Sequence, residues 1–383
     1  IMRPIQFITF FSIVIFIYSL INYYIFTHGY SATPEQYRPY FTVIFILLAS
    51  SFLGGRILER FWIPEVSHTM THVGSFWLAA MVYFLFAVFF IDVARGLNHF
   101  FHFFPAAFYH NYEQTKLYTS ISTIAIVALT VLAGHVNAIN PRIKNLSITI
   151  NKPLVTPLRI VALSDIHLGT VIGKQRLTHI VEKINSLDAD IVLLAGDQVD
   201  EDIAPVIRQN LGETLRNIKS KYGVFGVTGN HEYIGGVDKA YSYLVEHGIT
   251  MLRDEVVHVN GVCIIGREDI SSRGFANKQR KPLKELLHNA DASLPLILLD
   301  HQPFNLNDAV ENGIDLQLSG HTHNGQMFPF NYITKKVYEL DWGYKQKGDT
   351  HFYVSCGVGT WGPPVRIGNT PEIMCITLQG TSK

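Results

Sequence analysis

The chain of 383 residues has little cysteine, no net charge and no evident internal repeat. Its three cysteines, Cys263, Cys356 and Cys375, form no C-x-x-C pair, and an odd number of widely spaced thiols does not indicate a disulfide framework. We expect them to be small buried hydrophobic residues. Because 31 basic residues balance 31 acidic ones, no overall field recruits a polyanion, and nucleic acid is not an expected partner.

Charged residues are also scarce in the first third of the chain, where four apolar runs approach the ~20 residues that a helix needs to cross ~30 Å of hydrocarbon. The runs cover residues 5–26, 40 to about 54, 73–91 and 117 to about 139. The second run is short before Arg56 and Arg60, so a buried or re-entrant segment is the alternative there. The first could be a cleaved signal peptide, but it is long, lacks an evident cleavage site and is followed by further runs. We therefore predict a transmembrane helical domain of about four spans in residues 1–139.

Basic residues flank these runs unevenly. With four spans, one face of the membrane carries Arg38, Arg95 and Lys116, and the other carries twice as many basic residues. The larger group consists of Arg3, Arg56, Arg60, Arg142, Lys144 and Lys152. Because Lys and Arg are retained on the cytoplasmic side, the region after residue 139 is predicted to face the cytoplasm. An odd number of spans would move one terminus to the other side.

A stretch rich in aromatic residues and histidine, LNHFFHFFPAAFYHNY, separates the third and fourth runs and contains Pro105. Its composition suits a helix that lies in the headgroup region. His99, His102 and His110 could bind a metal, but an interfacial aromatic belt with polar tips is the favoured interpretation.

Residues 140–157 are polar and carry three prolines around the strand-like segment LSITI, which indicates a linker out of the membrane domain. From residue 158 to residue 383, short apolar runs rich in β-branched residues are interspersed with helical patterns at 174–186, 205–219 and 237–247. The runs are LRIVAL, DIVLLA, YGVFGV, VVHVN, VCIIG, LPLILL, IDLQLS, HFYVSC and EIMCITL. This alternation is typical of the α/β class, and the number of closely spaced strands favours two packed sheets flanked by helices.

Polar clusters directly follow five of the predicted strands. They are DIH at 165–167, GDQVD at 196–200, GNHE at 229–232, the pair at 300–301 and GHTH at 320–323. Ligands of open α/β sheets bind at the carboxyl ends of strands, so the clusters are predicted to form one site. Their donors are nitrogen and oxygen without cysteine, which favours Mn, Fe, Zn or Mg over metals that prefer thiolates. Each cluster is weak evidence alone, but five of them after strands make a metal site the better interpretation.

The first two clusters supply carboxylates and one imidazole. Asp165 and His167 lie two residues apart, so in extended chain they point to the same side and can reach one metal. Asp197 follows Gly196, which allows a tight turn, and its two oxygens can bridge two cations. Asp200 is interpreted as a helix cap or as an acceptor that orients a ligand.

The other three clusters supply an amide and imidazoles. Asn230 offers a neutral oxygen, and the adjacent His231 is placed to donate a proton to a leaving oxygen or to stabilise charge on phosphorus. His301, His321 and His323 can each bind a metal through one ring nitrogen while an acceptor holds the other. We therefore predict that His231 is the general acid.

These motifs resemble those of the calcineurin-like metallophosphoesterase superfamily, specifically its membrane-associated bacterial branch. The resemblance covers about residues 158–378 and includes DIH, GDQVD, GNHE, the histidine of LLDHQP and GHTHNGQ in the family's order. It implies a metallophosphoesterase domain over residues 158–383 with two mixed sheets flanked by helices. It also implies one metal held by Asp165, His167, Asp197 and His323, a second held by Asp197, Asn230, His301 and His321, and a catalytic His231 that binds no metal.

The implied function is hydrolysis of a phosphoester or pyrophosphate bond by an integral protein of a bacterial inner membrane. Two divalent ions, with Mn favoured, would let a bridging hydroxide attack phosphorus. The expected substrate is a phosphorylated small molecule or a lipid-linked phosphate, membrane lipid is the expected partner of the spans, and the oligomeric state is not predicted. The alternative is a noncatalytic membrane sensor or transporter subunit that binds metal or nucleotide, but the loss of His231 or of ligands expected for it is not seen.

Two further segments have open interpretations. The basic segment 267–281 could bind a second phosphate, although a solvated loop is favoured. Residues 359–368, with Trp361 and Arg366, could equally form a pocket wall or only a Gly/Pro-rich turn.

Overall fold

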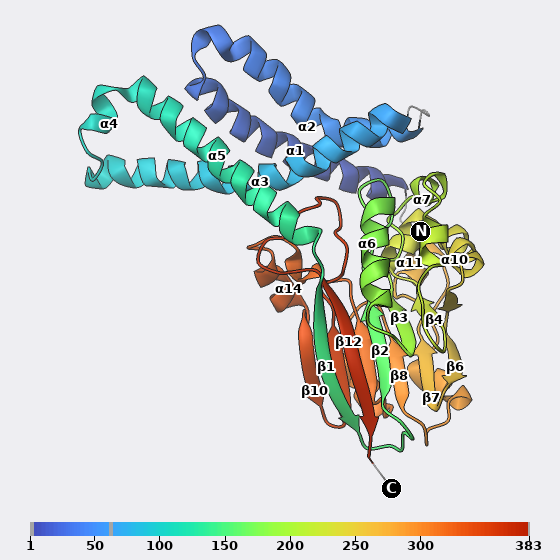
Figure 1. Cartoon of the computed structure of the whole chain (residues 1–383). Coiled ribbons are helices and arrows are strands. Elements are labelled where there is room, and N and C mark those ends of the chain that lie inside the picture. The colour runs from blue at the N-terminus through green and yellow to red at the C-terminus, as the bar shows by residue number, and fades with distance from the viewer. Residues whose placement is uncertain (1–3, 61–63, 382–383) are drawn as a thin grey trace. The chain divides into compact units, whose positions relative to one another are not determined.

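The computed structural model describes residues 4–60 and 64–381 (Figure 1). The chain divides into two compact units, a helical one up to His135 and a mixed α/β one that begins at Val136. Cys263 and Cys356 are buried, Cys375 is half-buried, and all three are free thiols.

The helical unit contains four long helices in its described residues. The helices are α1 (Pro4–Ala32), the 3-10 turn η1 (Glu35–Tyr37), α2 (Arg38–Arg60), α3 (Pro64–Phe101), α4 (Ala107–His110) and α5 (Tyr112–Ala138). All four long helices are long and apolar enough to cross a membrane, including α2, which continues past Arg56. The aromatic stretch between the third and fourth runs does not form one headgroup helix as predicted. Its first part extends α3 to Phe101, and the helix cannot continue through Pro105, which lacks an N–H.

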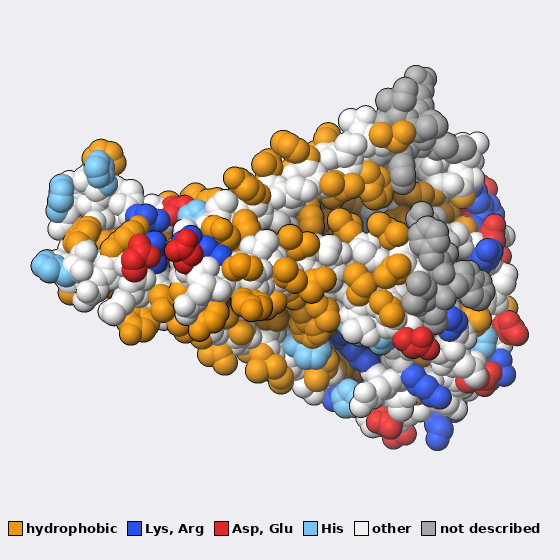
Figure 2. All heavy atoms as spheres, turned by 90° about the horizontal axis from the view of Figure 1, so that it is seen from above, with side chains coloured by type: hydrophobic (Ala, Val, Ile, Leu, Met, Phe, Trp, Pro, Cys, Tyr) orange, Lys and Arg blue, Asp and Glu red, His pale blue; other side chains and the backbone are white. Residues whose placement is uncertain are grey.

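Apolar side chains cover the outer surface of these helices. Leu47 is 64% exposed and Leu129 is 65% exposed, and Figure 2 shows hydrophobic side chains over most of the visible face. Inside the unit, α2 and α3 approach closely because Gly74 has no side chain, since a Cβ there would lie 2.2 Å from the backbone nitrogen of Phe52. A surface of this kind is stable in lipid rather than in water, so the protein is a membrane protein.

The α/β unit contains two six-stranded sheets, with strand orders β1-β12-β2-β3-β4-β5 and β10-β11-β9-β8-β7-β6. The strands are β1 (Arg142–Ile150), β2 (Leu158–Leu163), β3 (Ile191–Ala195), β4 (Val224–Val227), β5 (Thr250–Leu252), β6 (Glu255–Val259), β7 (Val262–Gly266), β8 (Leu296–Leu299), β9 (Leu316–Ser319), β10 (Gly343–Lys347), β11 (Thr350–Val354) and β12 (Glu372–Gly380). The helices are α6 (Lys174–Asn185), α7 (Ala204–Arg208), α8 (Leu211–Leu215), α9 (Asn230–Gly235), α10 (Val237–Glu246), α11 (Ser272–Phe275), α12 (Leu283–Leu286), η2 (Leu287–Asn289), α13 (Leu306–Glu311), η3 (His323–Gly325) and α14 (Asn331–Val337). Strands β2 to β5 are parallel, as are β7, β8, β9 and β11.

Three apolar layers hold the sheets and helices together. Alternate residues of a strand point to opposite faces, so Ile160 of β2 packs between the two sheets while Val161 packs under α6. On the outer face of the second sheet, Ile265 packs against Leu283 and Leu306 of two helices. This is the predicted α/β sandwich of two mixed sheets flanked by helices, and the fold-class prediction is confirmed.

Local assignments differ from the sequence expectations in three places. Part of the predicted linker forms β1, which pairs in parallel with β12 along its whole length. The predicted helix at 205–219 is two short helices, because Asn210 between them has a left-handed backbone with φ 52°. Strands β5 and β10 were not predicted, since β5 has three residues and β10 has the polar sequence GYKQK.

Candidate metal centre

The five polar clusters lie at the carboxyl ends of β2, β3 and β4 in one sheet and of β8 and β9 in the other. Backbone hydrogen bonds join neighbouring clusters: the Asp165 N–H donates to Gly196 O over 3.0 Å, and the His167 N–H donates to Asp197 O over 3.0 Å. Across the sheets, the His321 N–H donates to Asp165 Oδ1 over 3.0 Å. The ends of the two sheets therefore meet in one site.

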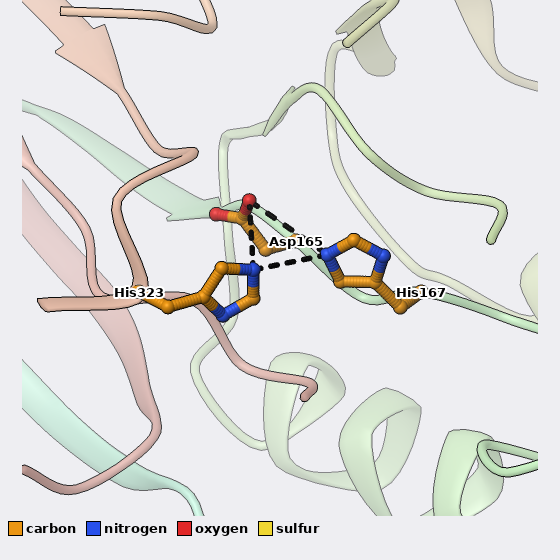
Figure 3. Close-up of side chains that lie close together, drawn as sticks. All are labelled: Asp165, His167 and His323. Carbon is orange, nitrogen blue, oxygen red and sulfur yellow. Dashed lines mark hydrogen bonds and ion pairs between the residues drawn. The ribbon is translucent and has the colours of Figure 1, made fainter. Parts of the chain in front are cut away.

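A first group of donors consists of Asp165, His167 and His323 (Figure 3). The Nε2 atoms of the two histidines are 3.0 Å apart. Asp165 Oδ1 lies 3.5 Å from Nε2 of His323 and 4.0 Å from Nε2 of His167. All three residues are buried, so the three donor atoms face one another away from bulk water.

A second group consists of Asp197, His301 and His321, with Asn230 beside it. Nδ1 of His301 lies 2.8 Å from Ala195 O, and its Nε2 lies 3.1 Å from Asp197 Oδ2 and 3.2 Å from Asn230 Oδ1. Because the proton of a neutral His301 lies on Nδ1, which donates to the carbonyl, Nε2 presents a lone pair to two oxygen acceptors. These atoms need a positive charge among them, which a proton on His301 or a divalent ion can supply, so the residues fit a metal.

Asp197 lies between the two groups. Its Oδ2 is 3.8 Å from Nε2 of His167 and 3.1 Å from Nε2 of His301, while its Oδ1 accepts from the His231 N–H over 2.9 Å. One oxygen therefore faces both groups and the other is used by the backbone. This differs from the expectation that each oxygen would serve one cation.

His231 lies beside the first group and is held by Asp200. Its Nδ1 is 3.1 Å from Asp200 Oδ1, and its ring centroid is 4.6 Å from that of His167 and 5.9 Å from that of Trp361. Asp200 also lies 3.6 Å from Nδ1 of His167. The carboxylate thus orients two adjacent imidazoles and does not act as a helix cap.

The charges in the site have opposite effects on its imidazoles. Burial lowers the pKa of His321 to about 3 and, with the charges of His167 and Arg366, that of His323 well below its usual value. Neutral imidazoles are the form that binds metals. Burial also acts against charge on His231, but the hydrogen bond to Asp200 and the charge of Asp197 raise its pKa to about 9. Burial likewise opposes charge on His301, but the charge of Asp197 raises its pKa well above the usual value. The imidazole assigned to proton donation is therefore one of those that carry a proton at neutral pH.

Glycines precede three of the donors and allow the strand ends to pack. A Cβ on Gly196 would lie 2.3 Å from Nδ1 of His301, and one on Gly229 would lie 2.1 Å from Asp197 Oδ1. At Gly320 it would lie 2.4 Å from Asp165 Oδ2. Any side chain at these positions would displace a donor.

The backbone of the site is also unusual. Five of the seven predicted metal donors have a left-handed backbone. They are Asp165, His167 and Asp197, each with φ 53°, His321 with φ 71° and His323 with φ 48°. Such conformations cost about 1–3 kcal/mol each and persist where function or surrounding structure requires them. Their concentration here points to a functional site.

Asp300, although it precedes His301, is not part of the cluster. It accepts from Arg267 Nη1 over 3.2 Å and from Arg280 Nη1 over 3.0 Å, and Arg267 also binds Asp308 over 2.9 Å. These cations of the basic segment 267–281 are paired with carboxylates of the same unit. This pairing does not favour the segment as a clamp for a second phosphate.

Two other residues contribute more than the sequence suggested. Glu232 is buried and accepts from the Gly229 N–H over 2.7 Å and the Val199 N–H over 2.9 Å, which fixes the turn that carries Asn230 and His231. Arg366 is fully buried and donates to the carbonyls of Cys356 and Gly359.

The Arg366 guanidinium also reaches the metal site. Its Nη2 lies 3.1 Å from Nδ1 of His323. Arg366 therefore lies behind His323 in the site, and no local motif marks it for this role.

Known proteins share this unit. Residues 158–325 match the family model of the calcineurin-like phosphoesterases. A metallophosphoesterase of Helicobacter pylori strain J99 is 40% identical over 62% of this chain and 64% of its own length. A metallophosphoesterase of Aquifex aeolicus is 32% identical over 66% of this chain and 98% of its own. A transmembrane protein with metallophosphoesterase domain from Bos taurus is 31% identical over 70% of this chain and 64% of its own.

The fold, the donor set and these relatives define a metal-dependent phosphoesterase class. The chain belongs to the calcineurin-like metallophosphoesterase family, and the resemblance seen in its motifs is confirmed. The match spans 64% of the Helicobacter pylori relative, and the bovine relative is named as a transmembrane protein.

Proposed function

We propose that this chain is a membrane-anchored phosphoesterase with two divalent ions. Asp165, His167 and His323 would hold one ion, Asn230, His301 and His321 would hold the other, and Asp197 would contact both. The observation that carries the proposal is the convergence of two donor groups on Asp197 Oδ2, at 3.8 Å from His167 and 3.1 Å from His301. Oxygen and imidazole donors suit Mn, Fe, Zn or Mg, of which we favour Mn.

The bound ions and the side chains near them would have different roles in hydrolysis. When bound, a pair of divalent ions supplies positive charge to phosphoryl oxygens and makes water acidic enough to attack at neutral pH. His231 holds a proton that it donates to the leaving oxygen, and Asp200 keeps its Nδ1 fixed at 3.1 Å. Trp361, which is 56% exposed and makes an edge contact with the His231 ring, would contact the leaving group.

The first experiment is hydrolysis of a substrate panel by purified full-length protein in detergent. We expect chelation to abolish turnover of nitrophenyl phosphates and added Mn to restore it. We also expect lipid-linked phosphates or pyrophosphates to be preferred over soluble esters, because the protein is held in the membrane that contains them. A preference for soluble esters would contradict the lipid-linked substrate alone. A metal-loaded protein that cleaves no member of the panel would contradict the phosphoesterase and favour a noncatalytic sensor.

We further propose that the protein lies in a bacterial inner membrane with its α/β unit in the cytoplasm. The support is the distribution of basic residues, three on one side of four spans and six on the other, of which Arg3 lies outside the described residues. The relatives in Helicobacter pylori and Aquifex aeolicus support a bacterial source, while the bovine relative is named as a transmembrane protein.

This orientation can be measured with a membrane-impermeant maleimide on intact spheroplasts. Gln36 is exposed in η1 between the first two spans, and Asp349 is exposed between β10 and β11, so each is replaced by cysteine in a separate variant. We expect the first to be labelled from outside and the second only after permeabilisation. The reverse pattern would place the α/β unit outside the cell.

A further inference from the structure

The helical unit contains a cavity of about 950 Å³ lined by α1, α2, α3 and α5. One part of its wall is apolar and aromatic and includes Ile25, Phe45, Trp77 and Phe84. Ile25, Phe45 and Trp77 belong to the buried core of the unit. The cavity is therefore a recess within the bundle, distinct from the outer faces of the helices that any bulk lipid would cover.

The other part of the wall is basic. Arg95 of α3 and Lys116 of α5 line it together with His28, His99 and His102, and the described lining residues include no carboxylate. The aromatic and histidine-rich stretch therefore contributes two of its histidines to a cavity.

Two nearby carboxylates pair with these cations, but both pairs are weak. Asp92 accepts from Tyr24 Oη over 2.7 Å and lies 2.9 Å from Nε2 of His28, while its distance to Arg95 is 3.6 Å. Glu113 lies 2.9 Å from Nζ of Lys116, but its side chain is 80% exposed, so the pair is weak. The two cations face the cavity and the two carboxylates do not line it.

The turn beside the basic part is fixed in place. Asn98 is buried, its Oδ1 accepts from the Phe104 N–H over 2.6 Å and its Nδ2 donates to Tyr109 Oη. Arg95 Nη2 donates to Tyr112 Oη over 2.9 Å. These bonds tie the end of α3 to the start of α5, so the basic side chains have a defined position.

The spacing of the two parts fits an amphiphile in a bilayer. Phe84 and Arg95 are 11 residues apart on α3, which corresponds to ~17 Å at ~1.5 Å per residue, and the ring centroid of Phe84 lies 6.1 Å from that of Trp77. The hydrocarbon core of a bilayer is ~30 Å thick, so the acyl chains of one leaflet span about half of that. An apolar tail along the aromatic wall would therefore place a charged head near Arg95 and Lys116.

We propose that the helical unit binds one acidic phospholipid, with its phosphate at Arg95 and Lys116 and its acyl chains against Phe45 and Trp77. Positive charge without lining carboxylates selects an anionic head, and the recess selects a single molecule over the surrounding lipid. This site is separate from the metal centre, and the proposal does not depend on the reaction proposed there.

The test uses full-length protein in phosphatidylcholine vesicles that contain a minor fraction of phosphatidylglycerol. Bromine atoms on an acyl chain quench the fluorescence of a tryptophan that the chain contacts. Either phosphatidylglycerol or phosphatidylcholine carries the brominated chains in a given sample. The signal of Trp77 is obtained by subtracting the fluorescence of a Trp77→Phe variant. We expect phosphatidylglycerol to occupy the site roughly 10- to 30-fold more tightly than phosphatidylcholine, because two basic residues attract its net negative charge, whereas choline balances the phosphate of phosphatidylcholine.

The double variant Arg95→Gln with Lys116→Gln should lose this selectivity, and Arg95→Lys with Lys116→Arg should retain it. The circular dichroism spectrum and melting temperature of both variants, compared with those of the unchanged protein, report that the protein is folded. Equal quenching of Trp77 by the two lipids in the unchanged protein would mean bulk lipid only and would overturn the proposal. Selectivity that survives in the glutamine variant would overturn it as well, and neither result bears on the phosphoesterase.

Discussion

Replacing Asp197 with asparagine is expected to remove metal from both proposed sites and to reduce hydrolysis to background. Asp197 Oδ2 is the one donor that faces both groups, at 3.8 Å from His167 and 3.1 Å from His301. Asparagine has nearly the same size, and its oxygen can still accept from the His231 N–H, so the backbone contact is retained. Mutating a residue that only supports a ligand costs 10–100-fold in metal affinity, and loss of a shared ligand should cost more.

The measurement is metal content per chain after dialysis, with thermal unfolding as a second readout. Added Mn should raise the melting temperature of the unchanged protein, because a ligand that binds only the folded state stabilises it, and it should not do so for the variant. Asp349→Asn, an exposed carboxylate beyond β10, is the matched control and should load metal normally. An Asp197→Asn protein that retains two ions per chain would refute the shared-ligand role.

The sequence allowed the architecture to be predicted because its strands are marked in two ways. Most are short, continuous apolar runs rich in β-branched residues, which are typical of buried strands, and a polar cluster directly follows five of them. Strand β10 has neither mark, since Tyr344 is the one hydrophobic residue of GYKQK, and its pairing with β11 is what orders it. The segment LSITI was recognised as strand-like, but the prolines around it indicated a linker, whereas it belongs to β1 and pairs with β12.

Within the site, residue types could be predicted but contacts across the sheets could not. Asp300 and His301 are adjacent, yet the carboxylate turns to Arg267 and Arg280 while the imidazole turns to Asp197. Only the fold decides between these outcomes, because the two arginines are far from Asp300 in sequence.

The sequence also does not show which atom of a side chain makes each contact. Asp197 Oδ2 faces the donor groups because Asp197 Oδ1 accepts a hydrogen bond from the His231 N–H. Arg366 contacts His323 from 43 residues away in a Gly/Pro-rich segment with no periodic signal. Packing between distant segments therefore determines these contacts, and local sequence patterns do not predict them.

Replacing His231 with alanine is expected to lower turnover by ~10²–10⁴ while both metals remain bound. Its ring is held by Asp200 at 3.1 Å and belongs to neither proposed ion site, although His231, His167 and Asp200 also form a close group of possible donors. The loss should depend on the leaving group, because an alkoxide needs a proton to depart and a nitrophenolate does not. We therefore expect a large loss with alkyl phosphates and a smaller one with nitrophenyl phosphate, whereas His258→Ala, an exposed histidine on β6, should change neither. An equal loss with both substrates would assign His231 to charge stabilisation, and a variant without metal would make it a ligand.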